Sequence, residues 1–144
     1  MANAKTILVV DDDMELSDGL RSVLERQGYR VFQARDGQQG KQMVYQHHPD
    51  LVILDMMMPR MGGYPVLEHF KGKADAPPII MITANEGSRH KAYAEHLGVV
   101  DYIRKPFAME RLLESVQKGL NAAAERKESS PPETKDSSGG SSSP

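Results

Sequence analysis

Short apolar runs alternate with longer amphipathic stretches along this chain. Four of the runs, at residues 7–10, 51–54, 79–82 and 102–104, are followed by Asp11, Asp55, Thr83 and Lys105, respectively. Continuous runs of this length are typical of strands buried on both faces, as in a parallel sheet. The carboxyl ends of parallel strands lie along one edge, so we expect these four polar side chains to meet there.

The amphipathic stretches predict helices between the strands. Leu16, Leu20 and Leu24 recur at helical spacing, and Gly28 is a natural helix terminator. The expected strands are residues 7–10, 29–34, 51–54, 79–82 and 99–104. The expected helices lie at about 16–28, 36–46, 66–70, 88–97 and 109–124, with a loop at 59–63. Five consecutive strand–helix units predict an α/β fold with a doubly wound, five-stranded parallel sheet and five helices.

Length and composition divide the chain into two parts. Its 144 residues suffice for one domain with one core, which we place at residues 1–124. Residues 125–144 are rich in serine, proline and glycine and contain no apolar side chain that could anchor a core. Such a segment cannot offset its ordering entropy, so we expect a disordered tail or linker.

Charge and composition exclude several classes of function. The 18 basic and 20 acidic residues give a net charge of -2, so nothing favours a nucleic-acid partner. No apolar stretch approaches the roughly 20 residues that cross a bilayer, so no membrane segment is expected and the cytoplasm is the expected location. The chain has no cysteine, which excludes disulfides and thiolate ligands. Its five histidines are scattered, and we interpret them as surface residues.

The acidic residues at the expected sheet edge predict a metal site. Asp11 and Asp12 end one strand and Asp55 ends another, and like-charge repulsion opposes three carboxylates in one place. A divalent cation resolves this conflict, and hard oxygen ligands suit Mg²⁺ better than zinc. Asp12 and Asp55 would bind the ion directly and Asp11 through water. Thr83 and Lys105 could then bind phosphoryl oxygens, with Asp55 as nucleophile.

These residues belong to segments that together resemble the receiver domain of two-component response regulators, over about residues 5–122. The matching segments are Val9-Val10-Asp11-Asp12, Ala34-Arg35-Asp36-Gly37, Asp55-Met56-Met57-Met58-Pro59-Arg60-Met61-Gly62-Gly63, Thr83-Ala84, Asp101-Tyr102-Ile103 and Lys105-Pro106-Phe107. The resemblance implies a flavodoxin-like fold and a protein that is a phosphoacceptor switch, not an enzyme in the usual sense. Such a switch assists its own phosphorylation and dephosphorylation.

The resemblance also implies a role for each site residue. Asp55 would be the phosphoacceptor, and Asp11, Asp12, Asp55 and the Met57 backbone carbonyl would hold Mg²⁺, with Mn²⁺ as an alternative. Lys105 would contact the phosphoryl group, and its peptide bond to Pro106 is expected to be cis. Thr83 and Tyr102 would form the switch pair.

The implied partners are a sensor histidine kinase or a histidine phosphotransfer protein. The output surface would comprise the fourth helix, fifth strand and fifth helix, at about residues 88–121, acting on an unknown downstream protein or a missing output domain. The chain would be a monomer or a phosphorylation-dependent dimer.

Three other functions remain open at this stage. A haloacid-dehalogenase-like phosphatase would also use an aspartate nucleophile, but it needs a second acid two residues later, where this chain has Met57. A flavodoxin-like cofactor binder would need a first loop rich in Ser, Thr and Gly, whereas this one has three acids. The third is a receiver-like interaction module that works without phosphorylation, which the complete set of site residues disfavours.

Overall fold

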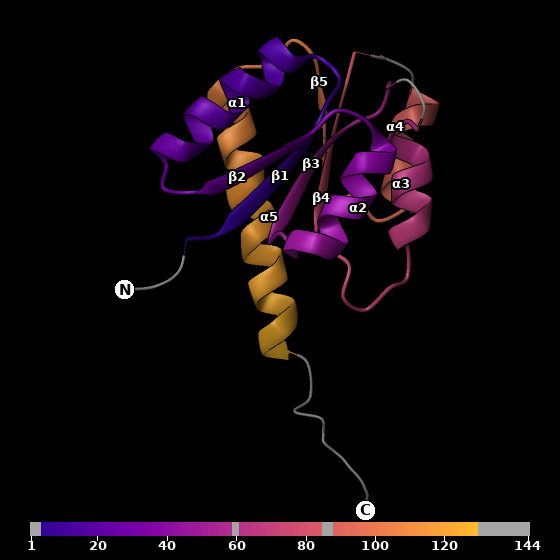
Figure 1. The fold of residues 1–144 in the computed structure, drawn as a ribbon. Coiled ribbons are helices and arrows are strands. Elements are labelled where there is room, and N and C mark those ends of the chain that lie inside the picture. The colour runs from indigo at the N-terminus through magenta and orange to yellow at the C-terminus, as the bar shows by residue number, and fades with distance from the viewer. Residues whose placement is uncertain (1–3, 59–60, 85–87, 130–144) are drawn as a thin grey trace, which may run out of the picture.

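The computed structural model describes residues 4–58, 61–84 and 88–129. Its strands are β1 (Thr6–Val10), β2 (Arg30–Ala34), β3 (Leu51–Asp55), β4 (Ile79–Thr83) and β5 (Asp101–Arg104). Its helices are α1 (Met14–Arg26), α2 (Gly37–His47), α3 (Gly63–Phe70), α4 (Ser88–His96) and α5 (Met109–Ser129). Strands and helices alternate along the described chain, as the hydrophobic pattern predicts (Figure 1).

The five strands form one parallel sheet in the order β2-β1-β3-β4-β5. Helices α1 and α5 cover one face, and α2, α3 and α4 cover the other (Figure 1). This confirms the doubly wound α/β fold. No helix in the described ranges is long and apolar enough to cross a membrane.

Alternate side chains of the central strands fill two hydrophobic cores, one on each face. In β1, Leu8 and Val10 belong to the core under α2 and α3, whereas Ile7 and Val9 belong to the core under α1 and α5. All residues of β3 and β4 are buried. Because burying one large aliphatic side chain stabilises a fold by about 1.5–3 kcal/mol, these strands fix the sheet register firmly.

Several element boundaries differ from the predictions, and α3 begins at Gly63, inside the expected loop at 59–63. The fifth strand begins at Asp101, two residues later than expected, because Gly98 has a positive φ and the Val99 amide bonds back to Ala94 to end α4. The last helix continues to Ser129 instead of ending near residue 124. Glu125 to Glu128 are strong helix formers, so the change in composition at 125 does not end the helix. The rest of the predicted tail, residues 130–144, lies outside the described residues.

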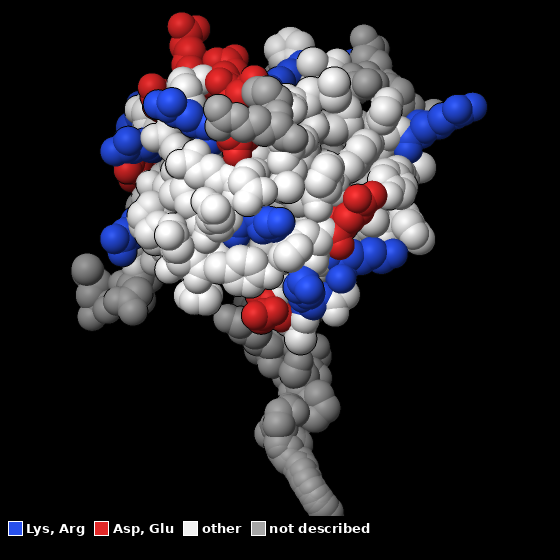
Figure 2. Space-filling model, turned by 45° about the vertical axis from the view of Figure 1, so that its right-hand side comes forward, with Lys and Arg blue, Asp and Glu red and all other residues white. Residues whose placement is uncertain are grey.

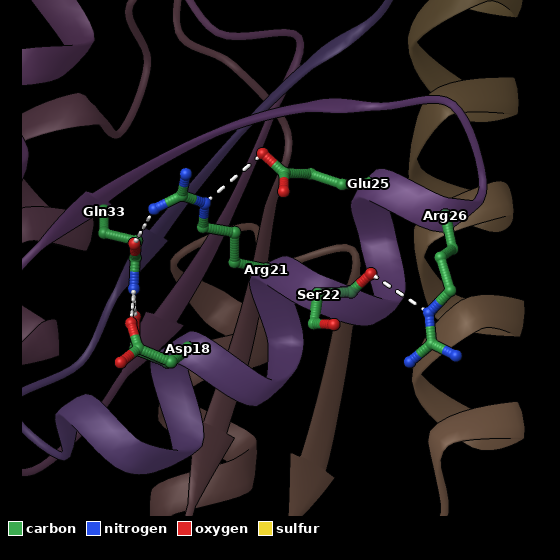
Figure 3. A network of polar contacts seen from close by, with 7 residues as sticks. Asp18, Arg21, Ser22, Glu25, Arg26 and Gln33 are labelled. Carbon is green, nitrogen blue, oxygen red and sulfur yellow. Dashed lines mark hydrogen bonds and ion pairs between the residues drawn. The ribbon is translucent and has the colours of Figure 1, made fainter.

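A polar network fastens α1 to the edge strand β2 (Figure 3). The Gln33 side-chain amide donates to Ser17 Oγ at 2.8 Å and to Asp18 Oδ1 at 2.9 Å, and Arg21 donates to Gln33 Oε1 at 3.2 Å. Asp13 caps the helix by accepting from the Leu16 amide at 3.2 Å. The network and the cap together position the loop in which Asp11 and Asp12 lie.

A second polar contact fastens α5 to β5. Arg111 donates to both carboxylate oxygens of Asp101, at 2.8 and 3.2 Å, and the Ser115 hydroxyl donates at 2.8 Å. Burial alone would raise the pKa of Asp101, but these hydrogen bonds and one from the Tyr102 amide outweigh it and lower that pKa to about 2. Asp101 is therefore a charged anchor beside Tyr102 and is not available as a proton donor near neutral pH.

Two glycine amides hold the loop after β3, one from the start of α2 and one from the start of α3. The Gly37 amide donates to the Met61 carbonyl at 2.8 Å, and the Gly63 amide donates to the Met56 carbonyl at 2.9 Å. A Cβ at Gly37 would lie 2.5 Å from the Met61 carbonyl oxygen and 2.9 Å from a methyl carbon of Val66. Only glycine allows this close approach.

We therefore predict that Gly37→Ala destabilises the protein. The added methyl group must displace backbone of the loop after β3, so the free energy of unfolding should fall by about 1–3 kcal/mol. Urea denaturation followed by circular dichroism measures this change. Gly19→Ala is the matched control, because Gly19 lies inside α1 and its Cβ would meet nothing within 4 Å. That variant should gain about 0.5–1 kcal/mol; equal effects of the two variants would refute the steric argument.

Candidate functional site

The sheet brings the predicted site residues to one edge. In the register of the sheet, Val10 pairs with Leu54, so Asp11 and Asp55 follow side by side, and Thr83 ends the adjacent strand β4. Carboxylate oxygens of Asp11, Asp12 and Asp55 all lie within 4.8 Å of one another. The convergence predicted for the three carboxylates is therefore present in the structure. Acidic side chains gather at the top of the molecule in Figure 2.

Lys105 reaches into this acidic cluster from the loop after β5. Its Nζ lies 3.1 Å from Asp11 Oδ2 and 3.5 Å from Asp55 Oδ2. Its backbone amide donates to the Thr83 carbonyl at 2.7 Å, which ties the loop to β4. The Lys105–Pro106 peptide bond is cis, as expected. One ammonium group thus contacts two carboxylates.

Burial and charge make the Asp55 carboxylate unfavourable in its ionised form. Asp11 is fully buried and Asp55 is 4% exposed, whereas Asp12 is exposed. Burial, and next the charge of Asp11, raise the pKa of Asp55, while Lys105 acts in the opposite direction. Burial would lower the pKa of Lys105, but the two carboxylates outweigh it and raise that pKa. Lys105 therefore stays charged but compensates only part of the acidic charge.

The donor set fits a hard divalent cation. It consists of three carboxylates on neighbouring strand ends, of which two are buried and one is open to solvent. Mg²⁺ prefers oxygen ligands and keeps several waters, and the exposed side of this cluster leaves room for them. The backbone amide of Met57 donates a hydrogen bond to Asp55 Oδ1 at 3.3 Å. That the Met57 backbone carbonyl binds the metal ion stays a prediction.

Thr83 and Tyr102 lie close together beside the cluster. Thr83 is fully buried at the end of β4, and Tyr102 pairs with Met81 on the neighbouring strand. Burial raises the pKa of Tyr102 and the Thr83 side chain lowers it. The buried Tyr102 hydroxyl nevertheless has no hydrogen bond of ordinary geometry within the described residues. The two hydroxyl groups are therefore close to each other.

Sequence reasoning missed two residues that support this site. It interpreted Asp36-Gly37 as a turn and helix start, although the Gly37 amide also holds the loop after β3. It also passed over Tyr64, whose hydroxyl joins α3 to α4. An aromatic hydroxyl directly after the Gly62-Gly63 turn was the available signal. The partner of that hydroxyl was not visible, because His90 lies 26 positions away in the sequence.

Comparisons with known proteins agree with this geometry. Residues 7–117 match the family described as the response regulator receiver domain. The chain is 40% identical over 107 residues to the response regulator MprA of Mycobacterium tuberculosis, covering 74% of this chain and 46% of that protein. MprA of Mycolicibacterium vanbaalenii is 39% identical over the same length. The chain thus spans less than half the length of the curated relatives that it matches.

Solved structures show the same fold. The signal receiver domain of a putative Luxo repressor protein from Vibrio parahaemolyticus superposes with a TM-score of 0.82 at 25% identity, covering 87% of this chain and 96% of that one. A CheY-like receiver domain protein from Methanospirillum hungatei gives 0.81 at 27% identity, covering 86% and 99%. The family match covers most of the chain, and the strand order and acidic cluster accord with it. This chain belongs to the response regulator receiver domain family of two-component signalling.

Proposed function

We propose that this chain is a phosphorylation-controlled switch in which Asp55 accepts a phosphoryl group from a phosphohistidine. The donor would be a sensor histidine kinase or a histidine phosphotransfer protein. The observation that carries this proposal is the position of the Asp55 carboxylate, which lies within 4.8 Å of two further carboxylates and 3.5 Å from Lys105 Nζ. This arrangement supplies a nucleophile together with a cation for the incoming phosphoryl oxygens.

In the transfer, an Asp55 carboxylate oxygen attacks phosphorus as the phosphorus–nitrogen bond of phosphohistidine breaks. The leaving imidazole keeps the electron pair and takes up a proton. Lys105 would move its contact from the carboxylates to a phosphoryl oxygen, and the Thr83 hydroxyl would donate to another. Asp11, Asp12, Asp55 and the Met57 carbonyl would hold Mg²⁺ or Mn²⁺. That ion, when bound, neutralises charge on the phosphoryl oxygens.

The same phosphoryl group would bias the switch. A hydrogen bond from Thr83 to a phosphoryl oxygen draws that side chain toward Asp55, and the adjacent Tyr102 side chain follows into the space released. Residues 88–121, in α4, β5 and α5, would then change their populations and present the output surface. The domain is proposed to assist its own phosphorylation and dephosphorylation without turning over an external substrate.

The segment shared with the curated relatives does not identify the proteins that act before and after this switch. A downstream protein or an additional output domain would receive the signal, and the chain would act as a monomer or a phosphorylation-dependent dimer. The division into a receiver at 1–124 and a tail, and the cytoplasmic location, stay predictions. A receiver-like interaction module that works without phosphorylation is the alternative outcome of the first experiment below.

The direct test is phosphorylation by acetyl phosphate in the presence of Mg²⁺. Intact-mass spectrometry should find one phosphoryl group on the wild-type chain, and none on Asp55→Asn or after removal of Mg²⁺ with EDTA. Beryllofluoride binding provides a second test, because fast hydrolysis of the acyl phosphate can hide the adduct. If wild type neither gains a phosphoryl group nor binds beryllofluoride, the phosphorylation-independent interaction module becomes the better conclusion.

The metal assignment predicts different effects for two neighbouring acids. Asp12→Asn should weaken Mg²⁺ binding by roughly tenfold or more, because affinity depends on the number of charged oxygen ligands. Asp13→Asn is the matched control, since Asp13 caps α1 and asparagine caps a helix equally well. Isothermal titration calorimetry measures both affinities. A similar affinity for the two variants would show that Asp12 is not a ligand.

A further inference from the structure

Helices α3 and α4 are joined by a line of polar and aromatic contacts. The Tyr64 hydroxyl donates to the His90 carbonyl oxygen at 2.9 Å, the Tyr93 hydroxyl donates to the Glu68 carboxylate, and Lys71 Nζ lies 3.3 Å from His96 Nε2. The ring of Tyr64 also stacks on His90 and meets the Tyr93 ring edge-on. We call these contacts the α3–α4 seam. Figure 2 turns this side forward, and uncharged side chains cover most of it.

The seam governs the position of α4 because this helix has little apolar packing. Of the side chains described in α4, at residues 89–96, only Ala94 is buried, and Tyr93 is 40% exposed; the buried Leu97 follows the helix directly. A buried alanine contributes far less than a buried leucine or isoleucine. The lateral hydrogen bonds to α3 therefore contribute a large share of what fixes α4. Among them, Tyr64 is half-buried.

The geometry at Tyr64 also defines the protonation of His90. The Tyr64 hydroxyl lies 3.1 Å from His90 Nδ1 as well as 2.9 Å from the His90 carbonyl oxygen. A hydroxyl has one proton, and when it donates to the carbonyl a hydrogen on His90 Nδ1 satisfies the second contact. This arrangement favours the Nδ1–H tautomer of neutral His90. This tautomer reports directly on the contact between Tyr64 and His90.

Tyr64 shares a hydrophobic core with the predicted switch residue Tyr102. Tyr64 and Tyr102 pack against the same hydrophobic core, and Tyr102 is the second cause, after burial, that raises the pKa of Tyr64. Helix α4 begins at Ser88, five positions after Thr83. A shift of the Tyr102 ring must be accommodated by the side chains that pack against this shared core, and Tyr64 is one of them.

We propose that Tyr64 is a positioning residue that holds the first turns of α4 in the unphosphorylated arrangement through its two contacts with His90. This proposal rests on the function proposed above. Loading of Asp55 would release the Tyr64 hydroxyl from His90 as Tyr102 and the end of β4 move. Removing the hydroxyl in advance would therefore lower the free energy needed to reach the loaded arrangement, and ligands that mimic the phosphoryl group would bind more tightly.

The test compares Tyr64→Phe with wild type by NMR during beryllofluoride titration in Mg²⁺. The variant keeps the ring and its stacking but lacks the hydroxyl. Its α4 amide signals should start displaced toward the loaded positions of wild type, and its beryllofluoride affinity should rise about fivefold, as expected for loss of one net hydrogen bond. Ring ¹⁵N shifts should show His90 as the Nδ1–H tautomer in wild type and a shift toward Nε2–H in the variant.

Tyr45→Phe is the matched control, because the Tyr45 hydroxyl bonds to His69 Nε2 at 2.7 Å, away from α4. It should change neither the His90 tautomer nor the affinity. Unchanged affinity and unchanged α4 signals in Tyr64→Phe would overturn the positioning role. If wild type itself fails to bind beryllofluoride, the proposed function falls and the coupling falls with it, while the tautomer measurement still decides whether the Tyr64–His90 contact exists.

Discussion

The repulsion between two buried carboxylates is the constraint on which the rest of this structure depends. Parallel pairing of β1 with β3 places Asp11 and Asp55 next to each other at the sheet edge, and both are almost fully removed from water. Lys105 contacts both and compensates part of their charge. A protein selected only for stability would replace such a cluster with apolar side chains. Its retention fits a site that binds further cations and a phosphoryl group.

The surrounding elements hold this unfavourable cluster in place from several directions. The cap at Asp13 and the Gln33 network position the loop after β1, and the Gly37 amide restrains the loop after β3. On the other side, the ion pair between Asp101 and Arg111 fixes β5, which contains Tyr102, against α5. Helix α4 differs from the other elements, because the hydrogen bonds and ring contacts of the α3–α4 seam supplement its limited apolar packing. The loops at the proposed site are thus held by several backbone and side-chain contacts, whereas α4 depends on contacts with one neighbouring helix.

The fold and the position of the site could be predicted from sequence because both follow from local pattern. Apolar runs define buried strands, and strand ends place Asp11, Asp55, Thr83 and Lys105 on one edge. The end of α5 could not be judged from composition, because helix formers such as Glu125 also occur in disordered segments. The contact between Tyr64 and His90 depends on how α3 and α4 pack, and no spacing rule indicates it. Side-chain partners across helices require the tertiary structure.

The most direct test of the central claim is the free energy of unfolding of wild type and Asp55→Asn, with EDTA and with saturating Mg²⁺. Asparagine keeps the shape of the side chain and removes one of the two repelling charges. The variant should be more stable than wild type in EDTA by about 1 kcal/mol or more, and Mg²⁺ should stabilise wild type much more than the variant. A less stable variant, together with equal stabilisation of both proteins by Mg²⁺, would contradict the claim that this site holds unfavourable negative charge that a bound cation relieves.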